Sequence, residues 1–495
     1  MGNRFSSIHA LPLRAIAASL VFASLAHGYH FAVDSFFLSS DPFIQQVCIP
    51  NIEKYRKSDV VVKFQDANGS PITGLQVQAN MIKHKFLFGA LIPTSQTAAT
   101  NALWLDVFNY GNPENAGKWD GLERSRDNWD FSRLDAMLAW CEQNGVVFEE
   151  HFLSGYIPSW AKGISDFNAR QLMHMKKVVD RYGARIPFYQ VDNEATLKNH
   201  SDWETMKSSY PNLANRFGIN NSINGGGWER AGDGDGEEVI PSFAKVNAYW
   251  PGLAYIANQL HPGGRWWGPK DLYDGMFTKY ENAPIKVHVT EFDAAQGFQM
   301  SGYRNVTLTE DLKAVYYVQV YATCFSAPSC NAISSWATMN YTGWSGNVGF
   351  AQNGTPVAAY HGLKSLIKDK LWTRTSGTSN AQGQLTFRGF HGKYEVVATG
   401  SGGVSIRDTF DLGPSQVPVM VTITPDGTVP VTQKRPIRSA ISTAPGKTLA
   451  TYNIHGQRLA ADGSSAVAHR GRQTAGVFIV RTESGSVARL ELIRK

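Results

Sequence analysis

Two glutamates follow strand-like apolar runs in this chain, and their placement suits one particular chemistry. Glu194 ends the segment RIPFYQVDNE, and Glu291 ends the segment PIKVHVTE. Hydrolysis of a glycosidic bond needs two carboxyl groups, one that protonates the leaving oxygen and one that acts as nucleophile or base. In a parallel barrel, side chains at the strand ends lie at the active face. The alternative for either acid alone is a helix cap or a surface ion pair.

The region that must position these acids alternates apolar runs with helical patterns between about residues 85 and 371. This alternation predicts a parallel α/β fold, with helices over 131–143, 168–182 and 312–325. Eight strands favour a (β/α)8 TIM barrel. A doubly wound sheet is the alternative, although no Gly-rich nucleotide-binding motif follows any strand. The predicted strands are 86–91, 107–110, 146–151, 186–191, 216–220, 253–259, 285–290 and 332–337.

Small β-rich regions are expected at both ends of this barrel. A β-rich lead-in covers 29–84, the barrel covers 85–371, and a small β accessory region at 372–424 is expected to pack beside the lead-in strands. Residues 425–446 are a linker rich in Pro, Ser, Thr and Arg, for which no packed structure is expected. Residues 447–495 are expected to form a basic β module.

The first 28 residues have the features of a signal peptide. Arg4 and Arg14 precede an apolar run of about a dozen residues, and small residues follow at Ala26 and Gly28. That run is too short to cross a bilayer as a helix, and no other segment approaches the necessary length. The sequence therefore predicts an exported bacterial protein, secreted or held at the cell surface, with no integral membrane segment.

Composition and cysteine spacing narrow the class further. Hydrophobic residues make up 43% of the chain and aromatic residues 12%, which is typical of a globular protein. Cys324 and Cys330 are a disulfide candidate in an exported protein, whereas Cys48 and Cys141 stay undecided. No zinc-binding spacing occurs, so neither a metal nor an organic cofactor is predicted.

The net charge of +6 is held by the tail. Residues 430–495 contain eleven Lys or Arg and three acidic residues, which leaves −2 for the rest of the chain. The basic balance therefore gives no support to nucleic-acid binding by the main domain.

Seven ordered motifs together resemble glycoside hydrolase family 10, the retaining endo-β-1,4-xylanases. The resemblance extends over about residues 52–424. Its motifs are FLFGALI, NPENAGKWD, the His151 segment ending in PSW, VDNE, ANQLHPGGRWWG, HVTEFD and SSWATMNYTGWSG. Seven matches in the family's order are much more specific than any single one.

The resemblance implies a role for each matched residue. Glu194 is then the general acid/base and Glu291 the nucleophile, Asn193 bonds the sugar 2-hydroxyl, and His261 holds the nucleophile. The resemblance also implies an apolar wall for the sugar and a set of hydroxyl contacts. The other substrate-binding residues that it implies are Glu114, Asn115, Lys118, His151, Gln259, Trp336 and Trp344.

The chain departs from the family pattern in three places. The family's Trp-Asp-Val-Val-Asn-Glu is here Tyr-Gln-Val-Asp-Asn-Glu, the stretch between His151 and Pro158 is shortened to FLSGYI, and a Gly-rich acidic loop occupies 225–238. For that loop, calcium binding and a solvated loop are both open. The expected substrate is xylan, with mixed-linkage glucan or xylo-oligosaccharides as alternatives. A non-catalytic polysaccharide-binding protein is the competing class, but binding alone needs no paired carboxyl groups.

The C-terminal segment YNIHGQRL, followed by GVFIVR, resembles the sorting domains of type IX secretion. That resemblance implies the secretion machinery as a partner of the tail. A basic carbohydrate- or surface-binding module is the alternative.

Overall fold

The computed structural model describes residues 30–93, 97–194, 201–221, 242–343 and 346–424, together with strand segments at 450–452, 458–459, 476–481 and 487–493. The chain forms two compact units, Met1–Thr432 and Gln433–Lys495. The predicted signal peptide (1–28) and linker (425–446) lie outside the described residues.

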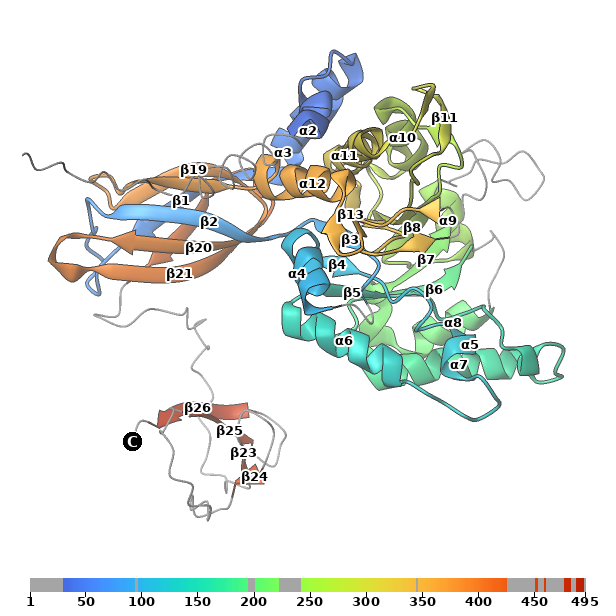
Figure 1. The fold of residues 1–495 in the computed structure, drawn as a ribbon. Coiled ribbons are helices and arrows are strands. Elements are labelled where there is room, and N and C mark those ends of the chain that lie inside the picture. Colours follow the sequence, from blue (N-terminus) through green and yellow to red (C-terminus); the bar gives the residue numbers. More distant parts are fainter. Residues whose placement is uncertain are drawn as a thin grey trace, which may run out of the picture. The chain divides into compact units, whose positions relative to one another are not determined.

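Eight parallel strands close into a barrel in the first unit, as Figure 1 shows, so the predicted (β/α)8 TIM barrel is confirmed. Each strand pairs with the next one along the chain, and the last strand closes the ring on the first. The second strand has two residues, and of its predicted range 107–110 only Tyr110 lies in a strand, since the preceding helix extends to Val107. The barrel strands are β3 (Leu87–Ala90), β4 (Tyr110–Gly111), β5 (Val147–Glu150), β6 (Phe188–Asn193), β7 (Phe217–Asn221), β8 (Tyr255–Leu260), β10 (Lys286–Phe292) and β13 (Cys330–Ser335).

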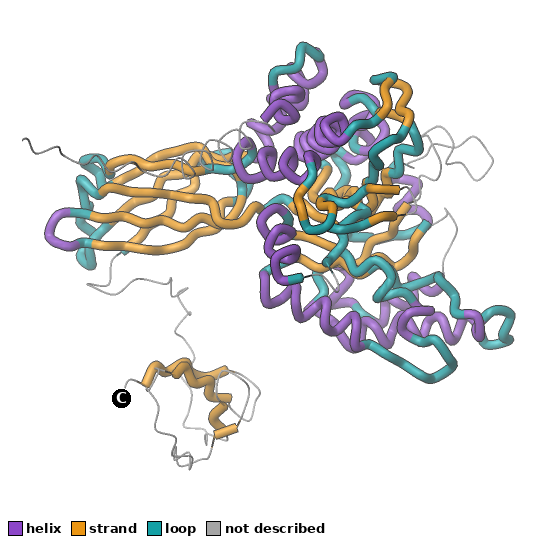
Figure 2. Tube along the Cα trace, in the orientation of Figure 1, coloured by secondary structure: helices purple, strands orange, loops and turns teal. Residues whose placement is uncertain are grey.

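Helices surround this barrel (Figure 2). α11 (Glu310–Ser326) is almost entirely buried, and it begins where the Thr309 hydroxyl accepts a hydrogen bond from the backbone N–H of Leu312. α6 (Ser132–Asn144) ends at Gly145, which adopts the left-handed conformation that favours glycine. The other helices of the barrel region are α4 (Ala98–Val107), α5 (Trp119–Leu122), α7 (Phe167–Tyr182), α8 (Ser201–Ser209), α9 (Phe243–Tyr249), α10 (Pro269–Met276) and α12 (Ala358–Lys364).

The prediction of a β-rich lead-in over residues 29–84 is wrong for its first half. That half contains α2 (His30–Phe37), a π-helical turn (Ile44–Cys48) and α3 (Ile49–Arg56). α2 buries Ala32, Val33 and Phe36 and packs against α11. Each helix has only about two turns, so tertiary packing and not a sustained sequence period stabilises it.

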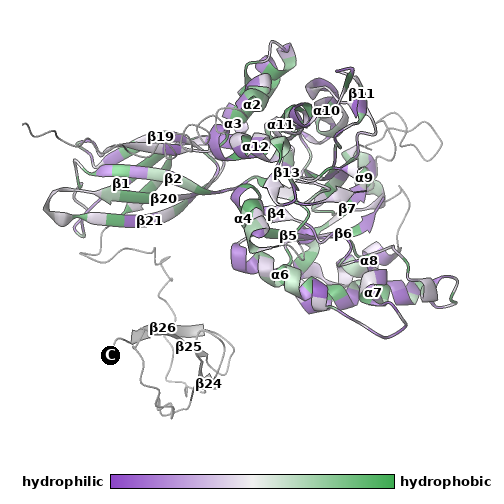
Figure 3. Cartoon of the chain, viewed as in Figure 1, coloured by the Kyte–Doolittle hydropathy of each residue, from purple (hydrophilic) through white to green (hydrophobic). Residues whose placement is uncertain are grey.

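The remaining lead-in strands and the strands after the barrel form one β sandwich. β1 (Lys57–Phe64) lies between β19 (Gln384–Phe390) and β22 (Val419–Ile423) in one sheet. The second sheet has the order β18-β2-β20-β21, made of β18 (Arg374–Thr378), β2 (Gln76–His84), β20 (Gly392–Thr399) and β21 (Ser405–Leu412). Alternate residues of these strands are buried, and Figure 3 shows the corresponding alternation of hydrophobic and hydrophilic residues.

The second unit contains one antiparallel sheet with the order β24-β23-β25-β26. Its strands are β23 (Ala450–Tyr452), β24 (Arg458–Leu459), β25 (Gly476–Arg481) and β26 (Val487–Ile493). β23 ends at Tyr452, the first residue of the YNIHGQRL segment, β24 is the last two residues of that segment, and β25 is GVFIVR.

The predicted disulfide between Cys324 and Cys330 is not formed. All four cysteines are free and buried. Burial raises the pKa of the Cys324 thiol well above its usual value, and a hydrogen bond with the Cys330 thiol adds to the shift. Buried cysteine commonly behaves as a small apolar side chain, which agrees with the apolar surroundings of both residues. Within the described part of the chain, no helix has the length and apolar character needed to cross a membrane.

Two adjacent glutamates at the end of β5 point to opposite faces of the barrel wall. Glu149 faces the interior, whereas Glu150 is enclosed outside it with no hydrogen-bond partner for either carboxyl oxygen among the described residues. Its carboxyl lies against the backbone of Gly117, where an added Cβ would come within 1.6 Å of Oε1. Burial raises the pKa of Glu150 to about 8. The folded protein therefore keeps this acid protonated at neutral pH.

Glu150→Gln should remove part of the pH dependence of stability. The native acid holds its proton up to about pH 8, but the unfolded chain releases it near pH 4.5. Rising pH thus favours the unfolded state in this window, by up to about 1.4 kcal/mol per pH unit. Thermal unfolding between pH 5 and pH 9 should show the variant gaining stability relative to the parent protein. The same dependence of melting temperature on pH in both proteins would contradict a protonated Glu150 in the folded state.

Candidate active site

The predicted acids and most of the predicted binding residues line one cavity at the carboxyl ends of the barrel strands. The cavity has a volume of about 430 Å³. Glu194 follows the last residue of β6, and Glu291 lies near the end of β10. Sequence analysis named eight of the lining residues: Lys118, His151, Asn193, Glu194, Gln259, His261, Glu291 and Trp336.

Glu291 is buried and held as a carboxylate. Its Oε1 accepts a hydrogen bond from Asn220 Nδ2 at 2.7 Å, and its Oε2 lies 3.3 Å from His261 Nε2. Burial opposes ionisation, but the hydrogen bonds from the charged His261 and from Asn220 outweigh it and lower the pKa of Glu291. The carboxylate is thus charged and fixed in orientation from both sides.

His261 lies between two carboxylates. Its Nδ1 is 2.9 Å from Asp293 Oδ1, and its Nε2 faces Glu291. Burial disfavours the imidazolium, yet the hydrogen bonds and charges of Asp293 and Glu291 raise the pKa of His261 to about 10. The imidazole is therefore protonated at neutral pH and donates through both nitrogens.

Asn220, which was not among the predicted site residues, connects Glu291 to the β6 side of the cavity. Asn220 Nδ2 donates to Asn193 Oδ1 at 2.8 Å as well as to Glu291. Gln259 Nε2 also donates to Asn193 Oδ1, at 3.1 Å. These two bonds fix the oxygen of Asn193, so its amide N–H groups are left to face a ligand, since no described residue accepts from them. The position of Asn220 could have indicated a site residue, because Asn220 is polar and ends the predicted strand 216–220.

Glu194 differs from Glu291 in its surroundings. Its side chain is exposed at the cavity and forms no hydrogen bond or ion pair with the described residues. Its backbone has φ = 54°, in the left-handed region that a non-glycine residue adopts at a cost. Glu114 and Tyr156 share this backbone conformation. Three such residues belong to the loops at the active face, where surrounding structure must hold them.

His151 has a defined tautomer because a chain of hydrogen bonds reaches it from below. Gln190 Nε2 donates to the carboxylate of Glu149 at 2.7 Å, so Gln190 Oε1 faces His151 Nδ1 at 2.7 Å as an acceptor. His151 must therefore carry its proton on Nδ1. Burial lowers the pKa of His151 to about 4, which keeps the ring neutral. Gln190 is one of the residues that departs from the family pattern.

Glu149 lies farthest from the cavity in this series of hydrogen bonds, and its carboxylate accepts hydrogen bonds from four side chains. Besides Gln190, its donors are Tyr110, Tyr255 at 3.0 Å and His288, whose Nδ1 lies 3.2 Å away. Burial favours the protonated acid, but the hydrogen bonds and the charge of His288 lower the pKa of Glu149 overall. The barrel interior thus contains a second buried carboxylate directly below the cavity residues.

Lys118 lies above aromatic rings at the rim of the cavity. Its Nζ donates to Asn115 Oδ1 at 2.8 Å and lies 3.8 Å from the centre of the Tyr156 ring. Burial lowers the pKa of Lys118, although the charges of Glu291 and Glu114 oppose the shift. Asn115 does not line the cavity itself, and it positions Lys118 through this hydrogen bond.

Glu114 and the tryptophans differ in their distance from the cavity. Glu114 Oε1 accepts from the Tyr341 hydroxyl at 3.1 Å, outside the residues that line the cavity. Trp336 lies 5.1 Å from the His151 ring and forms an apolar wall. Trp266 and Trp267 are buried in the core. Trp344 and the Gly-rich loop 225–238 lie outside the described residues.

No group of three or more His, Cys, Asp or Glu side chains in the described ranges has the arrangement of a metal site. The chemistry available to the cavity residues themselves is proton transfer and nucleophilic attack by two carboxyl groups in unlike environments, together with hydrogen bonding to hydroxyl groups and stacking on aromatic rings.

Glu149→Gln should destabilise the barrel and release His151 from its fixed tautomer. An amide offers one oxygen to four donors, so buried donors lose their partner, and the free energy of unfolding should fall by about 3 kcal/mol or more. Chemical denaturation measures that loss. ¹⁵N NMR of the histidine rings should show His151 as the Nδ1–H tautomer in the parent protein and a mixture in the variant. Glu204→Gln, on the exposed face of α8, is the control. An unchanged denaturation midpoint would contradict the described network.

Comparison with known proteins finds similarity to one family over part of the chain. The family model of glycosyl hydrolase family 10 matches residues 77–220. Anti-sigma-I factor RsgI6 of Acetivibrio thermocellus is 24% identical to this chain over 384 residues, which is 73% of this chain and 47% of that protein. Endo-1,4-beta-xylanase 3 of Hypocrea jecorina is 23% identical over 276 residues, which is 52% of this chain and 74% of that protein. The chain thus spans about half the length of the first relative.

A solved structure, that of xylanase 10B from Thermotoga petrophila in complex with xylobiose, aligns with 58% of this chain and 95% of its own, at 17% identity and a TM-score of 0.44. The matched segment 77–220 begins in the sandwich strand β2 and continues through the barrel to Asn220, and it includes Glu194. The family model and the curated relatives therefore show that part of this chain, residues 77–220, is similar to glycosyl hydrolase family 10.

Proposed function

We propose that this chain is a secreted endo-β-1,4-xylanase that hydrolyses xylan by double displacement with net retention. One observation carries the proposal: two carboxyl groups line the same cavity in opposite electrostatic environments. Glu291 is buried among donors, whereas Glu194 is exposed and unrestrained by described neighbours. A retaining glycosidase uses one carboxylate as the nucleophile and the other carboxyl group as acid and then base.

Glu291 is the proposed nucleophile. Attack on the anomeric carbon requires an ionised oxygen held in one direction, and Asn220 and His261 supply both conditions. His261 also stabilises the carboxylate that is regenerated when the glycosyl-enzyme is hydrolysed. Asp293, on the far side of His261, keeps the imidazolium charged throughout the cycle.

Glu194 is the proposed acid/base. In the first step its proton passes to the bridging oxygen as the glycosidic bond breaks, and the Glu291 ester forms. Esterification removes the charge of Glu291, so Glu194 is then free to ionise and to take a proton from the attacking water. An exposed carboxyl group at the cavity can exchange protons with solvent between these steps.

The remaining cavity residues suit a pyranose chain. The free amide N–H groups of Asn193 can donate to a 2-hydroxyl next to Glu291, and Lys118 can donate to vicinal hydroxyls. Trp336 offers an apolar face for the sugar ring. The name of the Hypocrea jecorina relative, endo-1,4-beta-xylanase 3, supports xylan as the substrate class. Export by residues 1–28 and sorting by the tail remain part of the proposal.

Glu291→Ala should abolish reducing-sugar release from xylan, with a loss of at least about 10⁴-fold in kcat, because the nucleophile is removed. The assay should include mixed-linkage glucan and carboxymethylcellulose. Glu204→Ala, a surface substitution on α8, serves as the control and should retain full activity. Activity on a glucan but not on xylan would be consistent with the proposed mechanism and would contradict xylan as the substrate. No release from any polymer by the parent protein would overturn the enzymatic proposal in favour of polysaccharide binding.

His261→Asn should move the acid limb of the pH–rate profile to higher pH. The protonated imidazole lowers the pKa of Glu291, so its removal raises that pKa and leaves more of the nucleophile protonated at a given acidic pH. The profile of kcat/KM against pH measures the shift. An acid limb at the same pH in both proteins would show that His261 does not control the ionisation of Glu291.

A further inference from the structure

A second cavity, of about 360 Å³, lies at the opposite end of the barrel from the candidate active site. Its walls include Leu87, Val147 and Phe188, which are the first residues of β3, β5 and β6. Arg56 at the end of α3 and His391 from the β sandwich close the other side. The proposed hydrolytic function uses none of these residues.

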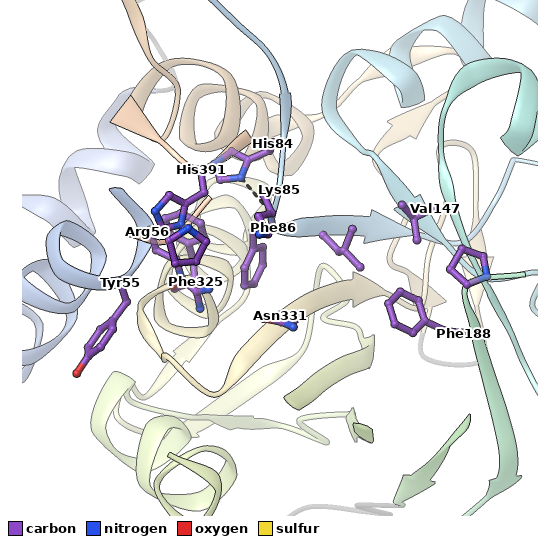
Figure 4. A pocket seen from close by; sticks show the side chains of 13 residues that line it. Tyr55, Arg56, His84, Lys85, Phe86, Val147, Phe188, Phe325, Asn331 and His391 are labelled. Carbon is purple, nitrogen blue, oxygen red and sulfur yellow. Dashed lines mark hydrogen bonds between the residues drawn. The ribbon is translucent and has the colours of Figure 1, made fainter. Parts of the chain in front are cut away.

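The lining of this basal cavity is positively charged and contains no acid. Arg56 and Lys85 supply its positive charge, His391 lines it as a neutral imidazole, and none of the thirteen lining residues is Asp or Glu. Figure 4 shows these three side chains gathered on one side of the cavity. Burial, reinforced by the charges of Lys85 and Arg56, lowers the pKa of His391 to about 4. The surroundings therefore favour an anion over an additional cation.

Arg56 is anchored on two of its three nitrogens. Its Nε donates to the carbonyl oxygen of Phe325 at 2.6 Å, and its Nη2 donates to those of Ala327 and Cys330 at 2.5 and 2.7 Å. These bonds fix the plane of the guanidinium. Its Nη1 bonds to no residue in the described ranges, and Arg56 forms no ion pair with a described carboxylate. Arg56 therefore lines the cavity as a rigid guanidinium whose Nη1 is not used by the described protein groups.

Aromatic rings form the apolar part of the same cavity. The Arg56 guanidinium carbon lies 4.9 Å from the centre of the Phe86 ring and 5.2 Å from that of Phe325. Phe188 lies across the cavity from these rings (Figure 4). A volume of about 360 Å³ accommodates a molecule with a single ring. Flat apolar walls next to a guanidinium complement a flat apolar ligand with an acidic head group.

The structural role of Arg56 explains only part of this arrangement. Nε and Nη2 of Arg56 bond to three carbonyl oxygens and so connect the end of α11 to β13, which is a structural role for these two nitrogens. It does not account for the convergence of Lys85 on the same cavity or for the absence of an acid from the lining. We propose that the basal cavity binds a small aromatic carboxylate, with the carboxylate at Arg56 and Lys85 and the ring between Phe86 and Phe188.

Isothermal titration of the full-length protein with cinnamate tests this proposal. Cinnamyl alcohol, which keeps the ring and lacks the charge, and inorganic phosphate, which keeps the charge and lacks the ring, are the matched ligands. Lys85→Glu should weaken cinnamate binding about tenfold or more, since it replaces an attractive charge with a repulsive one. Lys393→Glu, at an exposed residue of β20 that does not line the cavity, should leave the affinity unchanged. Arg56→Gln should also abolish binding, with thermal unfolding used to verify that this variant is folded.

Glu291→Gln separates this cavity from the active site, and it should bind cinnamate as the parent protein does. Equal binding of cinnamyl alcohol or of phosphate would overturn the assignment to aromatic carboxylates. So would unchanged cinnamate affinity in Lys85→Glu, or loss of affinity in Glu291→Gln. The failure of the xylanase proposal would leave these results unaffected, because the two cavities share no residue.

Discussion

A carboxylate enclosed in a barrel needs hydrogen-bond donors, and this constraint organises the centre of the molecule. Glu149 lies fully buried on β5, and donors reach it from four other strands: Tyr110, Gln190, Tyr255 and His288. Without them, the desolvation of one charge would cost several kcal/mol. The strands must therefore keep the register that brings these donors together. The same register sets the height at which the residues of the next layer emerge into the cavity.

The cavity residues above Glu149 also satisfy a buried carboxylate, that of Glu291, and this arrangement suits the proposed catalysis. Gln190 transmits the orientation of Glu149 to His151, while Asn220 and His261 hold Glu291. Glu194 has no such restraint and faces the open cavity. Two chemically identical side chains thus acquire different environments because one lies within a satisfied polar layer and the other beyond it. That difference is what a retaining glycosidase needs from its two carboxyl groups.

Local sequence pattern was sufficient for most of the barrel, because strands such as β8 and β10 are apolar runs that have polar residues near their ends, whereas β4 is only two residues long and was predicted too early in the chain. The same pattern indicated Glu194 and Glu291. It did not distinguish Glu149 or Asn220, since an interior polar residue is recognised only by the donors that other strands bring to it. The helices before Lys57 were missed because they are too short to show a period. The Cys324–Cys330 spacing allowed a disulfide, but it carries no information on whether the bond forms.

The anomeric configuration of the first product tests the proposed double displacement most directly. Hydrolysis of a xylo-oligosaccharide can be followed by ¹H NMR from the first minutes, before mutarotation mixes the anomers. Attack by Glu291 followed by attack of water predicts that the β-anomer appears first, because two inversions restore the original configuration. Initial release of the α-anomer would show a single displacement, and would contradict the assignment of Glu291 as the nucleophile.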